Sequence, residues 1–437
     1  MSFARSKLKS LRAVAFCFIT SVILTLAPAQ AAPHILVDLE TGRILDQKDA
    51  LTPWYPASLT KLMTAFVTFE AISAGEITMR SAVRVSKNAL SQAPSKMGFR
   101  VGTEVTVENA LKMVIVKSAN DIAVALGEAV GGSESKFVAR MNKAAAKLGM
   151  TGTRFKNPNG LPAKGQTTNA RDMAVLTQAI MKRYPQHRDL FKITAIKAGK
   201  RTLRSYNPLL TRYKGATGMK TGFICASGFN LVATAKRKNK HLIAVVLGSP
   251  SSQERAESAA GLLNKGFKPF TLKGRKNVKD IKASGGFVEP VNLRPLICSQ
   301  KARSDKAKRL KGYKMGEGKS LLSKNLLVSV KPVVVRTGGA VRSIAANLRN
   351  APTPIPRPNA QIAAALQSGD DAKALEAKIS ADAVDTGDGD GDQNTISETR
   401  TLGGIPIPLT RPAFAKVTGG SKSNDVDEKV AEEGADG

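Results

Sequence analysis

Apolar residues recur at helical spacing through the first half of the chain. The range 58–73 contains neither proline nor glycine, and it predicts a largely buried helix with Ser58 and Lys61 in its first turn. The range 107–130 has similar spacing but is interrupted at Ser118-Ala-Asn120. Polar side chains of this kind compete for backbone hydrogen bonds, so we expect a break between two helices there. Two further helices are predicted at 135–148 and 169–184.

Alternation of apolar and polar residues marks strands at both ends of the same region. The range 34–46 predicts a hairpin of two short strands. The ranges 227–235 and 241–248 are β-rich and are separated by a basic turn, so we expect them to pair antiparallel. A helix with one apolar face follows at 252–266. The pattern predicts an α+β fold, in which a helical subdomain is inserted between strands from the two ends of one domain.

The C-terminal third of the chain carries weaker patterns. One short strand pattern lies at 326–335 within an otherwise basic stretch, and we expect a small β-domain or a linker at 271–348. The range 349–437 is rich in proline, glycine and acidic residues, which predicts a largely disordered C-terminal extension. Its Asp- and Gly-rich run is similar to a calcium loop, but Thr399 stands where such a loop needs glutamate. We therefore expect no metal there.

The first 31 residues have the pattern of a secretory signal peptide. Four basic residues precede an apolar run of 15 residues, and Ala29-Gln-Ala31 is a small-x-small cleavage signal. The apolar run is shorter than the roughly 20 residues that span a membrane, so a retained anchor is the less favoured alternative. We expect export across the inner membrane to the periplasm, with the main folded domain at 32–270.

The charge of the chain is high and unevenly distributed. The formal net charge is +33, and residues 361–437 hold 15 acidic and 7 basic residues, which leaves +37 on residues 32–360. A body of this charge attracts polyanions such as cell-wall polymers or acidic lipid heads. Export and the lack of a groove-reading motif argue against nucleic acid as a partner. The alternative is that the charge only maintains solubility.

Three short motifs supply the polar groups of a serine acyl-transfer site. They are Ser58-Leu-Thr-Lys61, Ser118-Ala-Asn120 and Lys220-Thr-Gly222. A serine hydroxyl becomes nucleophilic when a nearby base removes its proton. Lys61 follows Ser58 by three residues, and on a helix this spacing places the two Cβ atoms roughly 5–6 Å apart. Burial and a second cation would lower the pKa of Lys61 towards neutrality, and Lys220 is the obvious second cation.

The other two motifs suit substrate contacts, although each has a structural alternative. At a helix break, the Ser118 hydroxyl could relay protons and the Asn120 amide could bind a substrate carbonyl; the alternative is an ordinary turn between helices. An edge strand at the third motif would pair with an extended peptide, and Gly222 would allow close approach. Lys220 and Thr221 would then bind the substrate carboxylate. The alternative is a turn that leads into a strand.

Segments around and between these motifs make the pattern specific. They are Tyr55-Pro-Ala-Ser-Leu-Thr-Lys-Leu-Met-Thr64, Lys117-Ser-Ala-Asn-Asp-Ile-Ala123, Phe137-Val-Ala-Arg-Met-Asn142, Leu148-Gly-Met150, Asn157-Pro-Asn-Gly-Leu161 and Lys220-Thr-Gly-Phe-Ile-Cys-Ala-Ser-Gly-Phe-Asn-Leu-Val-Ala233. Over about residues 32–270 the chain resembles the D-alanyl-D-alanine carboxypeptidases of the penicillin-binding proteins, serine peptidases that trim peptidoglycan stem peptides. This resemblance implies an antiparallel sheet with a helical subdomain, as in β-lactamases and DD-peptidases.

The resemblance also implies a role for each motif residue. It makes Ser58 the acylated nucleophile, Lys61 its base, Ser118 and Asn120 the proton relay and substrate contact, and Lys220, Thr221 and Gly222 the strand that binds substrate. The backbone N–H groups of Ser58 and Phe223 would form the oxyanion hole, and Arg255 would hold the terminal carboxylate. The implied partners are peptidoglycan stem peptides and, as covalent inhibitors, β-lactam antibiotics. No metal or organic cofactor is implied.

Several alternatives stay open at this point. A DD-endopeptidase that cleaves cross-links would use the same residues, whereas a β-lactamase is disfavoured because Ala119 stands where those enzymes carry Asp. A non-catalytic protein that binds cell-wall polyanions is a third possibility. The chain lacks the amphipathic C-terminal helix of the better-known relatives, so peripheral membrane contact is left open. We expect Cys225 to be a packed thiol, with a bridge to Cys298 as the alternative.

Overall fold

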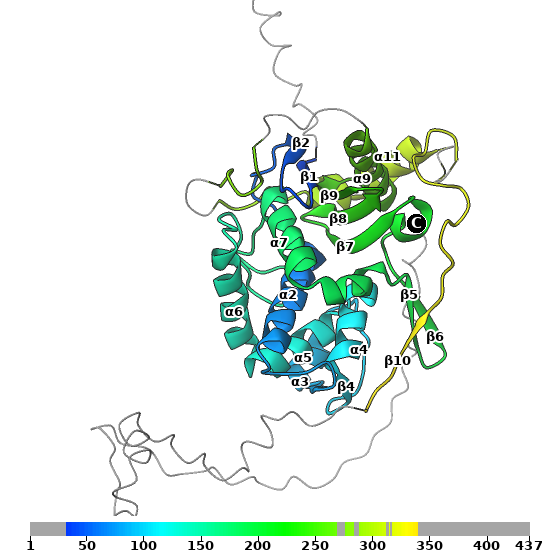
Figure 1. Cartoon of the computed structure of the whole chain (residues 1–437). Helices are drawn as coiled ribbons and strands as arrows, with labels where there is room; N and C mark the ends of the chain where they lie inside the picture. Colours follow the sequence, from blue (N-terminus) through cyan, green and yellow to red (C-terminus); the bar gives the residue numbers. More distant parts are fainter. Residues whose placement is uncertain (1–31, 269–275, 284–287, 312–313, 315–316, 340–437) are drawn as a thin grey trace, which may run out of the picture. The chain divides into compact units, whose positions relative to one another are not determined.

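The computed structural model describes residues 32–268, 276–283, 288–311, 314 and 317–339 (Figure 1). The predicted signal peptide at 1–31 and the predicted tail at 349–437 lie outside the described residues. Within these described ranges, no helix is both long enough and apolar enough to cross a membrane.

A five-stranded antiparallel sheet forms one half of the fold, with the strand order β2-β1-β9-β8-β7. The strands are β1 (His34–Asp38), β2 (Ile44–Lys48), β7 (Ala216–Ile224), β8 (Gly228–Arg237) and β9 (Lys240–Ser249). The N-terminal hairpin pairs with β9, so both ends of the domain meet in one sheet, as the sequence predicted. β7 lies at the edge of this sheet, and one of its two sides has no strand partner among the residues that the structure describes.

Alternate residues of the strands face two different cores, because side chains of a strand point to opposite faces. Leu36, Leu231 and Val246 pack against α9 (Ser252–Phe267) on one face of the sheet. Their neighbours Ile35 and Val232 belong to the larger core on the other face, which includes the helices. Figure 1 shows α9 on one side of the sheet and α7 and α2 on the other.

The helical half contains the helices that the apolar periodicity predicted. They are α2 (Thr60–Ser73), preceded by the 3-10 turn η1 (Ala57–Leu59), α4 (Val107–Lys112), α5 (Asn120–Gly131), α6 (Glu134–Lys147) and α7 (Ala170–Arg183). This half also contains two short elements that the sequence analysis did not predict, α3 (Lys87–Ser91) and the 3-10 segment η3 (Pro185–Lys192). The predicted interruption is present: α4 continues into the π-helical turn η2 (Met113–Lys117), and Ser118 has a left-handed backbone with φ of 62° before α5 begins.

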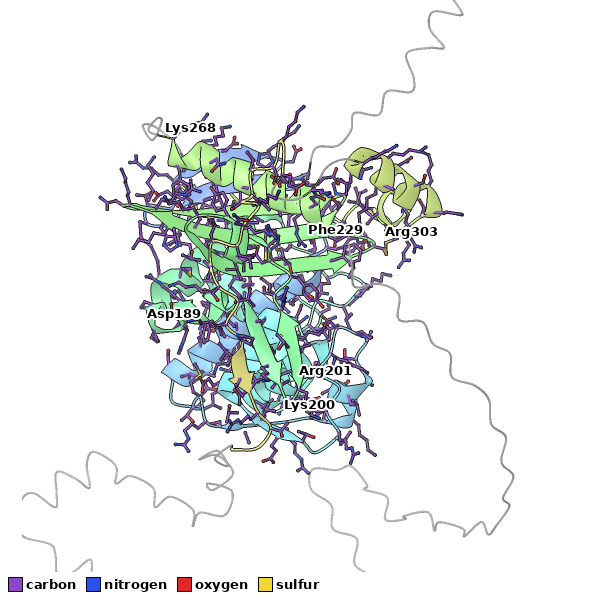
Figure 2. The ribbon with its side chains drawn as sticks, turned by 90° about the vertical axis from the view of Figure 1, so that its right-hand side faces the viewer. Asp189, Lys200, Arg201, Phe229, Lys268 and Arg303 are labelled. Carbon is purple, nitrogen blue, oxygen red and sulfur yellow. A yellow bond between two sulfur atoms is a disulfide. The ribbon has the colours of Figure 1, made fainter. Side chains whose placement is uncertain are left out.

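A second, smaller sheet, below the first in the view of Figure 1, includes a hairpin that the sequence patterns did not reveal. Its strands are β5 (Ala195–Ala198), β6 (Arg201–Arg204) and β10 (Val333–Val335), in the order β10-β5-β6. Figure 2 shows the hairpin of β5 and β6, with Lys200 and Arg201 at its tip. The remaining short elements are β3 (Ala82–Arg84), β4 (Glu104–Thr106) and α8 (Leu209–Arg212).

The described residues after 268 pack along the body of the protein. Val278 is buried, and its carbonyl accepts a hydrogen bond from the guanidinium of Arg171. Two helices follow, α10 (Arg294–Ile297) and α11 (Gln300–Leu310). Of the strand predicted at 326–335, only the last residues form β10, which pairs parallel with β5.

Candidate active site

Ser58 and Lys61 meet at the start of α2. Ser58 lies in η1 and Lys61 in the first turn of α2, and the Lys61 Nζ donates to the Ser58 Oγ over 3.1 Å. The same ammonium donates to the Asn120 Oδ1 at 2.7 Å and to the Asn159 carbonyl at 2.6 Å. Lys61 is completely buried. Its amine is therefore fixed against the serine hydroxyl by acceptors from two other parts of the chain.

The surroundings of Lys61 favour its neutral form. Burial, followed by the nearby charge of Lys220, lowers the pKa of Lys61 well below the ordinary lysine value, while Asp121 acts in the opposite direction. Burial has this effect because a low-dielectric site penalises a charge. A neutral amine 3.1 Å from a serine hydroxyl can accept its proton.

The middle motif joins the first motif to the third. Lys220 Nζ donates to Ser118 Oγ at 3.0 Å and to the Thr221 carbonyl at 2.9 Å. Asn120 accepts from Lys61 through its carbonyl oxygen, and its amide donates to the Ala93 carbonyl at 2.8 Å. The left-handed backbone of Ser118 lets the turn present both side chains to the site.

The third motif lies on the edge strand β7, directly against η1. A Cβ placed on Gly222 would lie 3.1 Å from the Pro56 carbonyl oxygen and 3.2 Å from the backbone nitrogens of Ser58 and Leu59. The lack of a side chain at Gly222 therefore allows this close approach. The next residue, Phe223, has 43% of its surface exposed, and its ring packs against that of Phe229 with 4.2 Å between the centroids.

Arg255 supplies a third buried cation next to the motifs. It is 3% exposed, and its Nη2 donates to the Tyr206 carbonyl at 3.1 Å. Burial lowers the pKa of Arg255 to about 10. Burial and the charge of Arg255 together lower the pKa of Lys220 to about 7. Within the described residues the buried Nε of Arg255 has no acceptor, so the site contains a donor that an anionic ligand could satisfy.

Comparison with known proteins agrees with this geometry. The family model for D-alanyl-D-alanine carboxypeptidases of peptidase family S11 matches residues 23–251, more than half of the chain. The chain belongs to this family. It is therefore a serine hydrolase, and its relatives place it in peptidoglycan metabolism.

Individual relatives support the same assignment. The chain is 33% identical to the D-alanyl-D-alanine carboxypeptidase DacF of Bacillus subtilis over 291 aligned residues. The alignment covers 63% of this chain and 74% of the relative. It is 36% identical over 265 residues to DacC of Escherichia coli, covering 59% of this chain and 65% of the relative. Among solved structures, penicillin-binding protein 5 of Haemophilus influenzae matches with a TM-score of 0.52 and 34% identity, over 55% of this chain and 72% of that one.

The structure places two further residues, Asn159 and Tyr206, beside the three motifs, and the sequence analysis assigned neither of them a role. Asn159 contributes its backbone carbonyl to Lys61, and its only sequence signal was the Asn157–Leu161 segment that resembled the family. Tyr206 accepts from Lys117 Nζ at 3.1 Å through its hydroxyl and from Arg255 through its carbonyl. Tyr206 therefore connects the residue next to Ser118 with the third cation.

The prediction of a packed thiol at Cys225 was wrong. Cys225 forms a disulfide with Cys298, 73 residues later in the chain. Next to this bond, the Leu293 N–H donates to the Ala226 carbonyl at 2.9 Å, and the Tyr55 hydroxyl donates to Glu289 at 2.9 Å. The segment that carries Cys298 is thus bound both to the turn after β7 and to Tyr55, three residues before the first motif.

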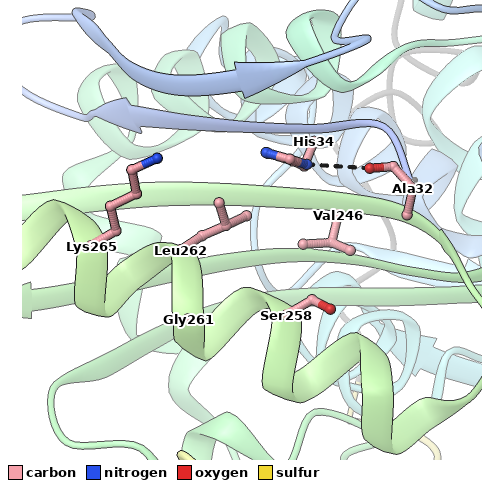
Figure 3. Close-up of a pocket in the computed structure, with 7 residues that line it drawn as sticks. All are labelled: Ala32, His34, Val246, Ser258, Gly261, Leu262 and Lys265. Atoms are coloured by element: carbon pink, nitrogen blue, oxygen red, sulfur yellow. Dashed lines mark hydrogen bonds between the residues drawn. The ribbon is translucent and has the colours of Figure 1, made fainter.

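A pocket of about 330 Å³ lies elsewhere, between the N-terminal hairpin, β9 and α9 (Figure 3). Figure 3 shows His34 and Lys265 at its wall, and the His34 Nδ1 is 3.2 Å from the Ala32 carbonyl. None of its lining residues belongs to the three motifs. The pocket is therefore separate from the candidate active site.

Proposed function

We propose that the chain is a serine carboxypeptidase that removes the terminal D-alanine from stem peptides ending in D-Ala-D-Ala, with Ser58 as the nucleophile. The observation that carries this proposal is the 3.1 Å hydrogen bond between Lys61 Nζ and Ser58 Oγ, together with the lowered pKa of Lys61. A hydroxyl paired with a buried, neutral amine is an activated nucleophile.

In acylation, Lys61 accepts the proton of Ser58 while Ser58 Oγ forms an ester with the carbonyl carbon of the penultimate D-alanine. The C–N bond to the terminal D-alanine breaks, and the proton that Lys61 accepted passes to the departing amine through Ser118, which lies within hydrogen-bond distance of Lys220, so Lys61 is neutral again. Water then attacks the ester, Lys61 accepts its proton, and Ser58 is released as the alcohol. The reaction consumes one water and leaves the shortened peptide and free D-alanine.

The edge strand supports substrate binding and charge stabilisation. In the described part of the chain one side of β7 has no strand partner, so an extended peptide can pair with its backbone. The N–H groups of Ser58 and Phe223 stabilise the oxyanion, a contribution of about 3–4 kcal/mol per donor in other acyl-transfer enzymes. Asn120 contacts the substrate amide, and Lys220, Thr221 and Arg255 hold the terminal carboxylate.

The domain limits and the cellular location complete the proposal. Residues 1–31 serve as a signal peptide for export to the periplasm, residues 32–270 form the catalytic domain, residues 271–348 a basic appendage, and residues 349–437 a tail without a catalytic role. β-Lactams acylate Ser58; the penicillin-binding protein D2 of Listeria monocytogenes, a relative of 28% identity and TM-score 0.50, has been solved in a cefotaxime-bound form.

The test is mass spectrometry of a soluble stem pentapeptide after incubation with the mature chain. Loss of one alanine with the wild type, and none with Ser58→Ala, is the expected result. A cross-linked dimeric peptide is incubated in parallel. Cleavage of the dimer without loss of alanine from the pentapeptide would identify a DD-endopeptidase instead, and a folded chain that acts on neither would remove the enzymatic proposal.

A further inference from the structure

Two strongly basic elements lie at opposite ends of the edge strand β7. The β5–β6 hairpin runs into Asn207, whose side-chain amide donates to the Gly218 carbonyl near the start of β7 at 3.2 Å. Helix α11 begins two residues after Cys298, which is bonded to Cys225 just past the end of β7. The strand proposed to bind the scissile peptide therefore has a basic element near each end.

The β5–β6 hairpin carries positive charge that no acidic residue of the hairpin balances. From Ala195 to Arg204 it contains four basic residues and no acidic one, and all four basic side chains are exposed. Within the part of the chain that the structure describes, none of them forms a salt bridge or a side-chain hydrogen bond. These residues are Lys197, Lys200, Arg201 and Arg204. An exposed hairpin with this composition maintains a positive potential near the active site.

Helix α11 has the same character and contributes nothing to a core. None of its residues is buried, and from Gln300 to Leu310 it has five basic residues against Asp305 alone. Lys301 pairs with Asp305 and Arg309 with Glu254, which leaves Arg303, Lys306 and Lys308 without an acidic partner among the described residues. Figure 2 shows Arg303 above and the hairpin tip below, in the same view of the protein.

Burial of apolar side chains does not explain why α11 is held in a fixed position on the protein. A helix that is polar all round gains little from burial, and isolated helices of this length are marginal in water. The disulfide at Cys298 and the Arg309–Glu254 pair nevertheless hold it at the end of β7. A fixed position next to the site and unpaired charge together favour a binding role over mere solubility.

We propose that the β5–β6 hairpin and α11 bind polymeric peptidoglycan through the free carboxylates of its stem peptides, and so hold the polymer across β7. This inference rests on the proposed function, because it assigns the polymer as the substrate of the same site. Charge complementarity supports the choice of partner: stem peptides carry several carboxylates, and a polymer presents many peptides at once, so weak contacts add through multivalency.

The experiment measures co-sedimentation of the full mature chain with purified peptidoglycan sacculi. Three charge-reversal variants are compared with wild type: Arg303→Glu/Lys306→Glu/Lys308→Glu in α11, Lys200→Glu/Arg201→Glu/Arg204→Glu in the hairpin, and a matched control on α6. The control carries Lys136→Glu/Lys143→Glu/Lys147→Glu, which has the same change in net charge on exposed residues. In Figure 1 α6 lies on the other side of the protein from the hairpin.

The first two variants should bind sacculi at least about 3-fold more weakly than wild type, because each lost ion pair removes a modest favourable contribution. The α6 control should bind like wild type, and 1 M salt should abolish the difference, since the screening length falls to about 3 Å. Hydrolysis of the soluble pentapeptide should be unchanged in all three variants. That rate also shows that the variants are folded.

Two outcomes would overturn the inference. Equal losses in the α6 control would mean that net charge alone drives binding, and unchanged binding by both site variants would mean that neither element takes part. A third outcome would replace the partner: if the site variants lose binding to phosphatidylglycerol vesicles but retain it to sacculi, the surfaces bind lipid headgroups. If wild type binds sacculi but does not hydrolyse the pentapeptide, the proposed function fails while the binding surface stands.

Discussion

Replacing Gly222 with alanine tests whether the spacing between β7 and η1 sets the rate of acylation. The added Cβ would lie 3.1 Å from the Pro56 carbonyl oxygen and 3.2 Å from the backbone nitrogens of Ser58 and Leu59. All three neighbours are backbone atoms, so no flexible side chain can move aside. The strand and η1 must instead separate by a few tenths of an ångström.

The size of the effect follows from that displacement. The N–H of Ser58 is one of the two proposed oxyanion donors, and Phe223 next to Gly222 provides the other. A misplacement of 1 Å in an active site can cost roughly 100-fold in rate, so a few tenths of an ångström correspond to roughly 3- to 10-fold. Overpacking should also cost about 1–3 kcal/mol of stability.

The assay is the rate of Ser58 acylation by a fluorescent penicillin under conditions where Gly222→Ala is fully folded. Gly261→Ala, a substitution within α9, is the matched control. Its added Cβ would meet only Leu321 Cδ1 among the described atoms, at an ordinary van der Waals distance of 3.5 Å. The control should acylate like wild type. If Gly222→Ala lowers the melting temperature but leaves the acylation rate unchanged, close approach of β7 to η1 is a packing feature and our account of the oxyanion hole is wrong.

Four further outcomes are expected. The pH profile of kcat/KM should fall above about pH 7, where Lys220 loses its proton, and Lys220→Arg should move that fall to higher pH; an unchanged profile would exclude Lys220 as the titrating cation. Arg255→Gln should raise KM for a pentapeptide whose C-terminal carboxylate is free. It should leave KM unchanged for the same pentapeptide with an amidated C-terminus. Reduction of the Cys225–Cys298 bond should destabilise the protein by up to about 4 kcal/mol, measured by denaturant unfolding, whereas Cys225→Ser/Cys298→Ser should be insensitive to reductant. Deletion of 349–437 should leave hydrolysis of the soluble pentapeptide unchanged, and a large loss of rate would assign the tail a catalytic role.

The sequence predicted those parts of the fold in which local periodicity and tertiary packing agree. The interruption at Ser118-Ala-Asn120 was predictable because three polar or small residues break an apolar helical pattern, and the structure has a helix break there. The N-terminal hairpin and the pairing of β8 with β9 followed from strand patterns beside short turns. Each of these features is determined within about 25 residues of chain.

Features that depend on distant contacts were not accessible in this way. Asn159 reaches Lys61 through a backbone carbonyl, and a carbonyl leaves no trace in the residue type. The Cys225–Cys298 bond closes 73 residues, so only the three-dimensional path of the chain could reveal it. The hairpin of β5 and β6 was missed because four charged residues obscure its apolar alternation, and β10 retains only three residues of a longer predicted strand.

The three buried cations of the site have a consequence for catalysis. Lys61, Lys220 and Arg255 are all almost completely buried, and the nearby Asp121 carboxylate is occupied by the backbone N–H groups of Met97, Gly98 and Ile122. Uncompensated buried charge is costly, and both lysines respond with lowered pKa values.

In the proposed mechanism, a substrate carboxylate that pairs with Lys220 and Arg255 supplies the missing negative charge. Because the charge of Lys220 helps to lower the pKa of Lys61, compensation of Lys220 by the substrate raises the pKa of Lys61 and makes it a stronger base towards Ser58. Recognition of the terminal carboxylate and activation of the nucleophile are therefore coupled through electrostatics. In the proposed mechanism, a peptide with a free terminal carboxylate therefore strengthens as a base the amine that the site already holds against Ser58 in its neutral form.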